Sequence, residues 1–195
     1  TNLTIMGNTE MDETTRQKKE RSIWDRMAAS YDDRTLKRYE RAYALSIRKT
    51  QAVLAPDHRV LEIGCGTGIV SLGIAPSVRQ AVATDISPEM VAAARRKAGA
   101  LAISNVTFRV ADGYALPYDA GSFNAVLLFN VLHFVKQPAA LLQEAHRLLA
   151  PSGHLVSVTD CYAEPAPLPT RLMLGAQKLL NLLGIIPYTW YYTKA

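Results

Sequence analysis

Cysteine is scarce in this 195-residue sequence, which contains only Cys65 and Cys161, far apart along the chain. A small secreted scaffold held by disulfides is therefore excluded, and a reducing compartment is the simpler interpretation. No apolar run reaches the roughly 18 residues that a membrane-spanning helix requires, and residues 1–20 are too polar for a signal peptide. We expect a cytoplasmic protein without a transmembrane segment.

The excess of positive charge is small, and where charges are dense the two signs are mixed. The net charge is +5, and the first 50 residues carry 11 basic and 8 acidic side chains in an interleaved pattern. This is typical of a solvated helical face, whereas a phosphate-binding stripe gathers one sign on one face. The pattern argues against a nucleic-acid partner, and no cluster of metal ligands is expected.

What the sequence does contain is the composition and patterning of a globular domain, with 49% hydrophobic and 20% charged residues. Helical spacing of apolar residues from 21 to 54 predicts two or three helices. After Pro56, short apolar runs alternate with helix-compatible segments, as in a buried parallel sheet. The expected strands are Val60–Ile63, Ala81–Thr84, Val106–Val110, Ala125–Phe129 and His154–Thr159, and the expected helices are Thr67–Ala75, Pro88–Ala98 and Pro138–Leu149.

This alternation predicts the α/β class, with a doubly wound, mainly parallel sheet preceded by helices. The expected organisation is a flexible segment 1–20 and a single domain 21–195. Within that domain we expect a helical cap 21–55, a cofactor-binding core 56–160 and a substrate lid 161–195. Ligands of such sheets bind at the carboxyl ends of the strands.

A glycine-rich loop follows the first expected strand, with Gly64, Gly66 and Gly68 at every second position. Glycine permits a tight turn and lets the backbone approach a ligand closely. A dinucleotide-binding loop would carry its third glycine where Ile69 stands, which counts against a nicotinamide-dependent dehydrogenase. A plain strand-to-helix turn is the structural alternative.

Two aspartates end the next two expected strands. Asp85 would stand beside the glycine loop, where a carboxylate can accept both hydroxyls of a ribose. Asp112 can accept from an exocyclic amine and suits an adenine edge flanked by Ile86 and Met90. The alternatives are a helix cap for Asp85 and a surface turn for Asp112.

Together these residues resemble the Rossmann-like S-adenosylmethionine-dependent methyltransferases. The closer resemblance is to the small-molecule branch that includes the ubiquinone and menaquinone biosynthesis C-methyltransferases. It covers residues 23–160 and depends on the order of many short motifs. These are Trp24-Asp25, Tyr31-Asp32, Glu62–Gly68, Asp85 with Ser87–Met90, Asp112 with Leu116-Pro117, Phe123, Asn130–His133 and Leu148–Gly153.

The resemblance implies S-adenosyl-L-methionine as cofactor, S-adenosyl-L-homocysteine as product and a small, lipophilic or aromatic acceptor. Ala111 and Asn124 depart from the residues that are frequent in the family, but neither carries an expected cofactor contact. The residues carried over to the cofactor site are Tyr31, Glu62, Gly64, Cys65, Gly66, Gly68, Asp85, Ile86, Met90, Asp112, Gly113 and Asn130.

Three further residues near strand ends have open roles. His133 is the candidate base, because imidazole most readily takes a proton near neutrality, although packing is the alternative. Asp160 is a candidate for binding acceptor or cofactor, with a turn as the alternative. Cys161 is a weaker candidate nucleophile, because no second matching motif accompanies it.

The leucine-rich segment 171–184 and the aromatic run 188–192 predict an acceptor-site lid, a subunit contact or a peripheral membrane anchor, so a homodimer stays open. Five strands are expected where the family usually has seven, so the last strand pair is expected to be missing from this chain. The alternatives to a small-molecule methyltransferase are a non-catalytic cofactor-binding or dimer-partner protein on the same fold and an RNA methyltransferase.

Overall fold

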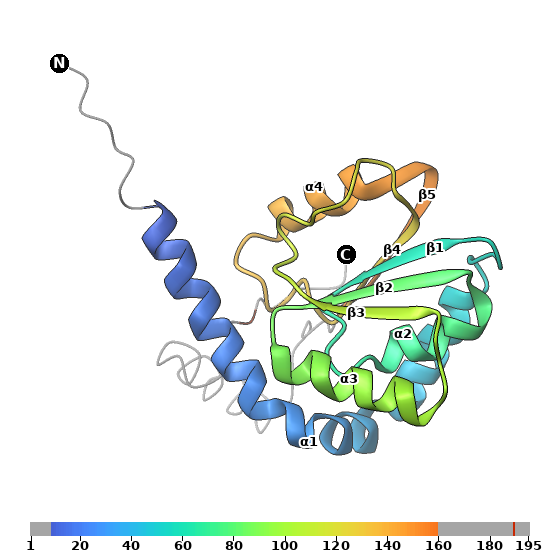
Figure 1. Ribbon diagram of the computed structural model, residues 1–195, viewed down its shortest axis with the longest axis horizontal. Helices are drawn as coiled ribbons and strands as arrows, with labels where there is room; N and C mark the ends of the chain where they lie inside the picture. Colours follow the sequence, from blue (N-terminus) through green and yellow to red (C-terminus); the bar gives the residue numbers. More distant parts are fainter. Residues whose placement is uncertain (1–8, 160–188, 190–195) are drawn as a thin grey trace, which may run out of the picture.

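The computed structural model describes residues 9–159 and 189, and within them five strands form one parallel sheet in the order β3-β2-β1-β4-β5. Figure 1 shows the sheet with helices against both of its faces. The elements in chain order are α1 (Thr9–Gln51), β1 (Arg59–Ile63), α2 (Ile69–Ile74), the 3-10 helix η1 (Ala75–Ser77), β2 (Gln80–Asp85), α3 (Pro88–Ala100), β3 (Val106–Val110), β4 (Phe123–Phe129), α4 (Pro138–Leu148) and β5 (Leu149–Val158).

All five predicted strands and the three predicted core helices are present, and the predicted doubly wound α/β class is confirmed. Asp160, Cys161 and the segment 171–192, apart from Thr189, lie outside the described residues. Among the described helices, no stretch is both long and apolar enough to cross a membrane.

The apolar core is divided by the sheet into two halves. Successive residues of a strand point to opposite faces, so Val60 packs in one half and Leu61 in the other. The first half lies between the sheet and α2 and α3, and the second between the sheet and α4 (Figure 1). Because both faces of the central strands are covered, these strands consist of consecutive apolar residues in the sequence.

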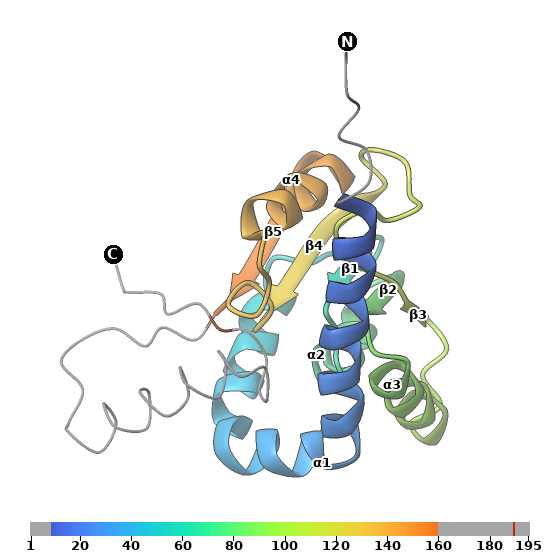
Figure 2. The ribbon, with the colours of Figure 1, turned by 90° about the vertical axis from the view of Figure 1, so that its left-hand side faces the viewer.

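Helix α1 differs from the expectation for the first part of the chain. It begins at Thr9, inside the segment predicted to be flexible, and a single helix of 43 residues replaces the predicted two or three. A straight helix of that length would extend for about 65 Å, but the ribbon of α1 bends sharply and turns back along the domain (Figure 2). Its first half therefore lies across the carboxyl ends of the strands, and its second half packs Tyr43 and Ile47 against the core.

The strand order places a topological switch point beside β1. β1 pairs with β2 on one side and with β4 on the other, so the loops that leave β1 and β4 separate in opposite directions. Ligands of open parallel sheets bind in the crevice that this creates.

Candidate functional site

The glycine loop after β1 keeps its shape through backbone contacts and positive φ angles. The N–H groups of Gly64 and Cys65 both donate to the carbonyl of Thr84, at 2.8 and 2.9 Å. Gly64 has a φ of +74°, and a Cβ there would lie 2.3 Å from Val131 Cγ2. A Cβ on Gly66 would meet only Tyr31, at 3.8 Å, so the loop faces open space under α1 at that point.

Asp85 connects this loop to the start of α3. Its Oδ2 accepts the Gly66 N–H at 2.8 Å, and its Oδ1 accepts the Ser87 N–H at 2.9 Å. Burial raises the pKa of Asp85 above its ordinary value, and the charge of nearby Asp25 adds to this, while the backbone donors oppose it. The cap of α3 is Ser87, whose Oγ accepts the Met90 N–H, so the cap interpretation of Asp85 is wrong.

Glu62, on β1, is a second buried carboxyl at the same edge. It is only 2% exposed, and its carboxylate accepts a hydrogen bond from the Ser71 hydroxyl of α2. Burial raises the pKa of Glu62 to about 8, with the Ser71 contacts acting in the opposite direction. The neighbouring Cys65 thiol also has a raised pKa because it is buried, so it is a poor nucleophile.

Asp112 lies beyond β3 and completes a row of carboxyl groups at the ends of three adjacent strands. Its Oδ2 accepts from Gln17 Nε2 of α1 at 2.8 Å, and its Oδ1 accepts the Tyr114 N–H at 3.4 Å. The next residue, Gly113, leaves no room for a side chain, since a Cβ there would lie 2.4 Å from Ile63 Cγ2. Asp112 lines the same pocket as Glu62 and Asp85.

Asn130 follows β4 and has a φ of +54°, in the left-handed region that asparagine tolerates better than most residues. Its backbone N–H donates to the Val158 carbonyl at 2.7 Å, and its Nδ2 donates to the Tyr43 hydroxyl at 3.1 Å. The Oδ1 atom is buried and accepts no hydrogen bond from the described residues. Such an atom is costly to bury without a partner, which favours a ligand donor at this position.

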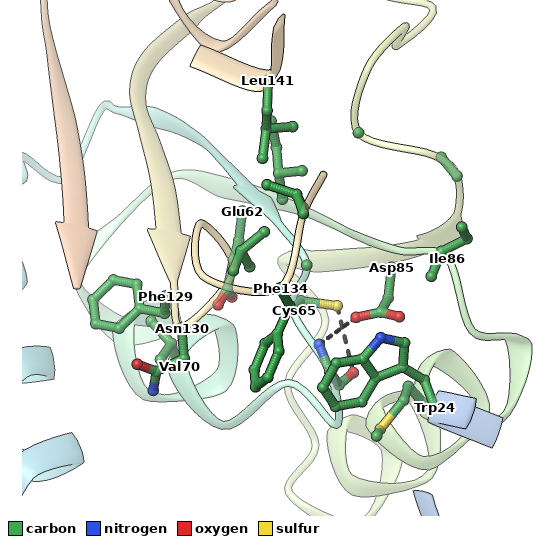
Figure 3. Close-up of a pocket in the computed structure, with 18 of the residues that line it drawn as sticks. Trp24, Glu62, Cys65, Val70, Asp85, Ile86, Phe129, Asn130, Phe134 and Leu141 are labelled. Atoms are coloured by element: carbon green, nitrogen blue, oxygen red, sulfur yellow. Dashed lines mark hydrogen bonds between the residues drawn. The ribbon is translucent and has the colours of Figure 1, made fainter. Parts of the chain in front are cut away.

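These groups surround one pocket of about 950 Å³, measured with the part that opens to solvent. Figure 3 shows Glu62, Asp85 and Asn130 around it. The pocket brings together every residue predicted for the cofactor site except Gly68, which caps α2 and packs under Phe108 and Ala94. Four carboxyl residues line it, and no Lys, Arg or His stands among the lining residues of the described chain. The carboxyl residues are Glu20, Glu62, Asp85 and Asp112.

His133, the predicted base, is not among the residues that line this pocket. It is 2% exposed, and its ring packs on Phe134 with centroids 4.0 Å apart. Phe134 itself lines the pocket, so His133 stands behind it. This arrangement supports the packing interpretation of His133.

Tyr31 was predicted to close over the cofactor, whereas the pairing of Trp24 with Phe134 at the pocket was not predicted. Trp24 of α1 and Phe134 of the loop after β4 meet edge to face with centroids 5.0 Å apart, and both line the pocket (Figure 3). The spacing of Glu20, Trp24 and Tyr31, four and seven residues apart, is the signal in the sequence that places them on one helical face. Their partners could not be found from the sequence, because the contacts span the whole domain.

Polar contacts hold the first half of α1 over the pocket. Asp25 Oδ1 accepts from the Ser87 hydroxyl at 2.5 Å, and Asp32 Oδ2 accepts from Lys97 Nζ at 2.6 Å. Asp32 also accepts from the Thr67 hydroxyl of the glycine loop. The helix is therefore attached to the segments that shape the pocket.

The parallel sheet and the pocket at its carboxyl edge define a Rossmann-like domain of the methyltransferase type. The profile of a family described as "Methyltransferase domain" matches residues 61–157. The matched segment has the sequence of this family, and the chain resembles class I S-adenosylmethionine-dependent methyltransferases.

Two curated relatives show the range of the family. A demethylmenaquinone methyltransferase of Clavibacter sepedonicus is 33% identical over 153 residues, covering 77% of this chain and 61% of the relative. A ubiquinone biosynthesis O-methyltransferase of Xanthomonas oryzae is 38% identical over 126 residues, covering 64% and 52%. This chain thus spans little more than half the length of these relatives.

Solved structures agree on the fold. The YcgJ protein of Bacillus subtilis has a TM-score of 0.64 at 24% identity, covering 79% of this chain and 63% of that one. A DhpI complex with S-adenosylhomocysteine has a TM-score of 0.63 at 26% identity, covering 74% and 70%. The [4+2]-cyclase SpnF also matches, with a TM-score of 0.59 at 29% identity, covering 64% and 46%.

Proposed function

We propose that this protein transfers a methyl group from S-adenosylmethionine to a small, largely apolar or aromatic metabolite. The observation that carries the proposal is the row of carboxyl groups at the ends of β1, β2 and β3, all facing one pocket. Glu62, Asp85 and Asp112 supply hydrogen-bond acceptors where the polar parts of a nucleoside cofactor need them.

The charge of the pocket suits this cofactor. S-adenosylmethionine carries a sulfonium and an ammonium group, and both favour a site with carboxylates and without cationic side chains. The unpartnered Oδ1 of Asn130 offers an acceptor for the ammonium end. Asp85 would hold the ribose hydroxyls, and Asp112 the adenine amine, with Ile86 and Met90 against the ring.

S-adenosylmethionine supplies an activated methyl group, so the protein chiefly has to align the acceptor and exclude water. Trp24, Tyr31 and Phe134 lie on the side of the pocket that α1 and the loop after β4 close. These residues would shield the reacting centre. No described histidine lines the pocket.

The nature of the acceptor is inferred from the rest of the lining. Phe129, Val131, Val135 and Leu141 present apolar surface, which suits a neutral, lipophilic molecule. The two curated relatives are named for menaquinone and ubiquinone biosynthesis. We therefore propose phenolic or quinol-like rings as the first acceptors to test.

Titration calorimetry with S-adenosylhomocysteine tests the cofactor site, and transfer of a labelled methyl group to a panel of phenols and quinols tests the reaction. Binding together with transfer supports the proposal. Binding without transfer to any acceptor would favour a non-catalytic or different activity on the same fold, of which the [4+2]-cyclase among the structural relatives is an example. Transfer to RNA alone would favour a nucleic-acid methyltransferase.

A further inference from the structure

Asp25 of α1 contacts the N-terminus of α3, 62 residues further along the chain. Its Oδ1 accepts a hydrogen bond from the hydroxyl of Ser87, the N-cap residue, at 2.5 Å. The same oxygen accepts the backbone N–H of Glu89 in a longer contact of 3.4 Å. A carboxylate is favourable at this place, because the first N–H groups of a helix have no partner within the helix and carry partial positive charge.

The sequence at the start of α3 explains why other segments supply the carboxylates there. In a capping box, the residue three positions after the N-cap is Glu or Gln, and its side chain accepts the backbone N–H of the N-cap residue. Met90 stands at that position, so α3 cannot complete such a box by itself. The Ser87 N–H donates to Asp85 instead, and the Ser87 hydroxyl donates to Asp25.

Ser87 therefore connects three parts of the molecule. Its backbone N–H donates to Asp85 Oδ1 at 2.9 Å, its Oγ accepts the Met90 N–H at 3.1 Å, and its hydroxyl proton goes to Asp25. Ser87 is 0% exposed, and a buried hydroxyl without an acceptor is costly. Loss of the Asp25 carboxylate would force this hydroxyl to turn toward another acceptor, and the other two bonds of Ser87 would be disturbed with it.

Both groups that Ser87 holds belong to the pocket. Asp85 and Met90 line it, whereas Asp25 and Ser87 are not among its described lining residues. We propose that Asp25 is a positioning residue for the nucleoside half of the cofactor, because it holds Ser87 and thereby fixes Asp85 for the ribose and Met90 for the adenine. This inference rests on the proposed function. It gives α1 a role in cofactor affinity besides covering the pocket.

The hydrogen bond and the charge of Asp25 act in opposite directions. Burial raises the pKa of Asp85, and the negative charge of Asp25 raises it further. An ionised carboxylate is the stronger acceptor for hydroxyl groups, so the charge of Asp25 by itself works against ribose binding. The bond to Ser87 is therefore the part that should favour the cofactor. Asp25→Asn separates the two effects, since it keeps a side-chain oxygen and removes the charge.

The test measures binding by calorimetry to the wild type, Asp25→Ala, Asp25→Asn and a control, Asp33→Ala, at an exposed position of the same helix. The ligands are S-adenosylhomocysteine and 5′-methylthioadenosine, which contains the adenine and the ribose without the amino-acid part. Asp25→Ala should bind both ligands roughly three- to tenfold more weakly, the range that corresponds to one net hydrogen bond. Asp25→Asn should recover most of this loss, and Asp33→Ala should bind as the wild type does.

Ser87→Gly tests the path of the effect. Glycine is tolerated at an N-cap, so α3 should keep its start while the hydroxyl that contacts Asp25 is removed. This variant should weaken the binding of both ligands to a similar extent as Asp25→Ala, and it replaces that variant if Asp25→Ala does not fold. Adding Asp25→Ala to Ser87→Gly should have little further effect. A full additional loss in the double variant would place the effect of Asp25 elsewhere and overturn the proposal.

The melting temperature without ligand separates positioning from a purely structural role. A lower melting temperature with unchanged affinity in Asp25→Ala would mean that Asp25 only stabilises the fold. Weaker binding of S-adenosylhomocysteine alone would place the effect on the amino-acid part, and equally weak binding by both Asp25 variants would assign it to the charge. Each of these results overturns the proposal while the proposed function stands. If the wild type binds neither ligand, the proposed function fails and the inference with it.

Discussion

Asp85 accepts the backbone N–H of Gly66 at 2.8 Å, so the end of β2 fixes the shape of the loop that follows β1. The same carboxylate accepts the Ser87 N–H at the start of α3. One side chain therefore sets the relative positions of the glycine loop and a helix N-terminus. A buried carboxylate with such contacts retains free lone pairs on both oxygens for a diol.

Replacement of Asp85 by alanine is expected to weaken binding of S-adenosylhomocysteine roughly ten- to hundredfold, because hydrogen bonds to a charged group are lost. Asp57→Ala is the control. Asp57 is exposed and precedes the N-terminal end of β1, whereas the pocket lies at the carboxyl end of this strand. Calorimetry on the three proteins measures the effect. Equal affinity of wild type and Asp85→Ala would show that the ribose does not bind at this carboxylate.

The glycine loop yields a stability prediction with a matched control. Gly64→Ala places a Cβ 2.3 Å from Val131 Cγ2 at a φ of +74°, and such strain should lower the free energy of unfolding by about 1–3 kcal/mol. Gly99→Ala, in helix α3, meets nothing within 4 Å and should be neutral or stabilising by about 0.5–1 kcal/mol. Denaturant unfolding measures both variants. A Gly64→Ala protein as stable as the wild type would mean that the loop relaxes without cost.

The strands and core helices could be predicted because their signals are local. Buried parallel strands are short apolar runs, and prolines start two of the three core helices. The row of Glu62, Asp85 and Asp112 could be predicted as well, since parallel strands bring their carboxyl ends to one edge. The sequence also suggested a nucleoside ligand from the spacing of these residues.

The path of α1 could not be predicted, because it depends on contacts far apart in the sequence. The Asp32 contact to Lys97 spans 65 residues, and the Trp24 contact to Phe134 spans more than half of the chain. The interleaved charges of residues 1–50 had suggested only a solvated helical face. In the structure, three polar residues of that segment, Gln17, Asp25 and Asp32, point inward and hold the helix over the pocket.

The raised pKa of Glu62 predicts a pH dependence of stability. With a pKa of about 8 in the folded protein against an ordinary value of 4.5, the folded state binds more protons than the unfolded state between these values. The free energy of unfolding should therefore fall as the pH rises from about 5 to about 8. Burial of Asp85 acts in the same direction at the acidic end of this range.

Glu62→Gln should flatten this dependence, since glutamine keeps the shape of the side chain without titrating. Glu40→Gln, at an exposed position of α1, should leave the dependence unchanged. Thermal unfolding at several pH values without cofactor measures the slopes. If the wild type became more stable toward pH 8, Glu62 would have to be ionised in the folded protein.

Asp32 gives a prediction about the retention of the cofactor. Asp32→Asn weakens the contacts to Lys97 and Thr67 that attach α1 to the pocket, so dissociation of S-adenosylhomocysteine should become several-fold faster. Asp33→Asn changes the neighbouring exposed residue and should have no effect. Stopped-flow kinetics measures the dissociation rate of S-adenosylhomocysteine from each variant. Equal rates for both would exclude a role of the Asp32 contacts in holding α1 over the bound ligand.

Trp24 tests whether the aromatic cover protects the site. Its ring meets Phe134 edge to face, a contact that contributes about 0.5–1.5 kcal/mol beyond the apolar area it buries. Trp24→Ala should lower kcat/KM for methyl transfer roughly tenfold, because water gains access to the pocket and the acceptor loses part of its alignment. Trp24→Phe retains an aromatic edge and should recover most of that loss.

The melting temperature of Trp24→Ala should fall by only a few degrees, because Trp24 is half-buried at the rim of the fold. Equal loss of activity in the two variants would indicate that the indole makes a specific contact that a phenyl ring cannot replace.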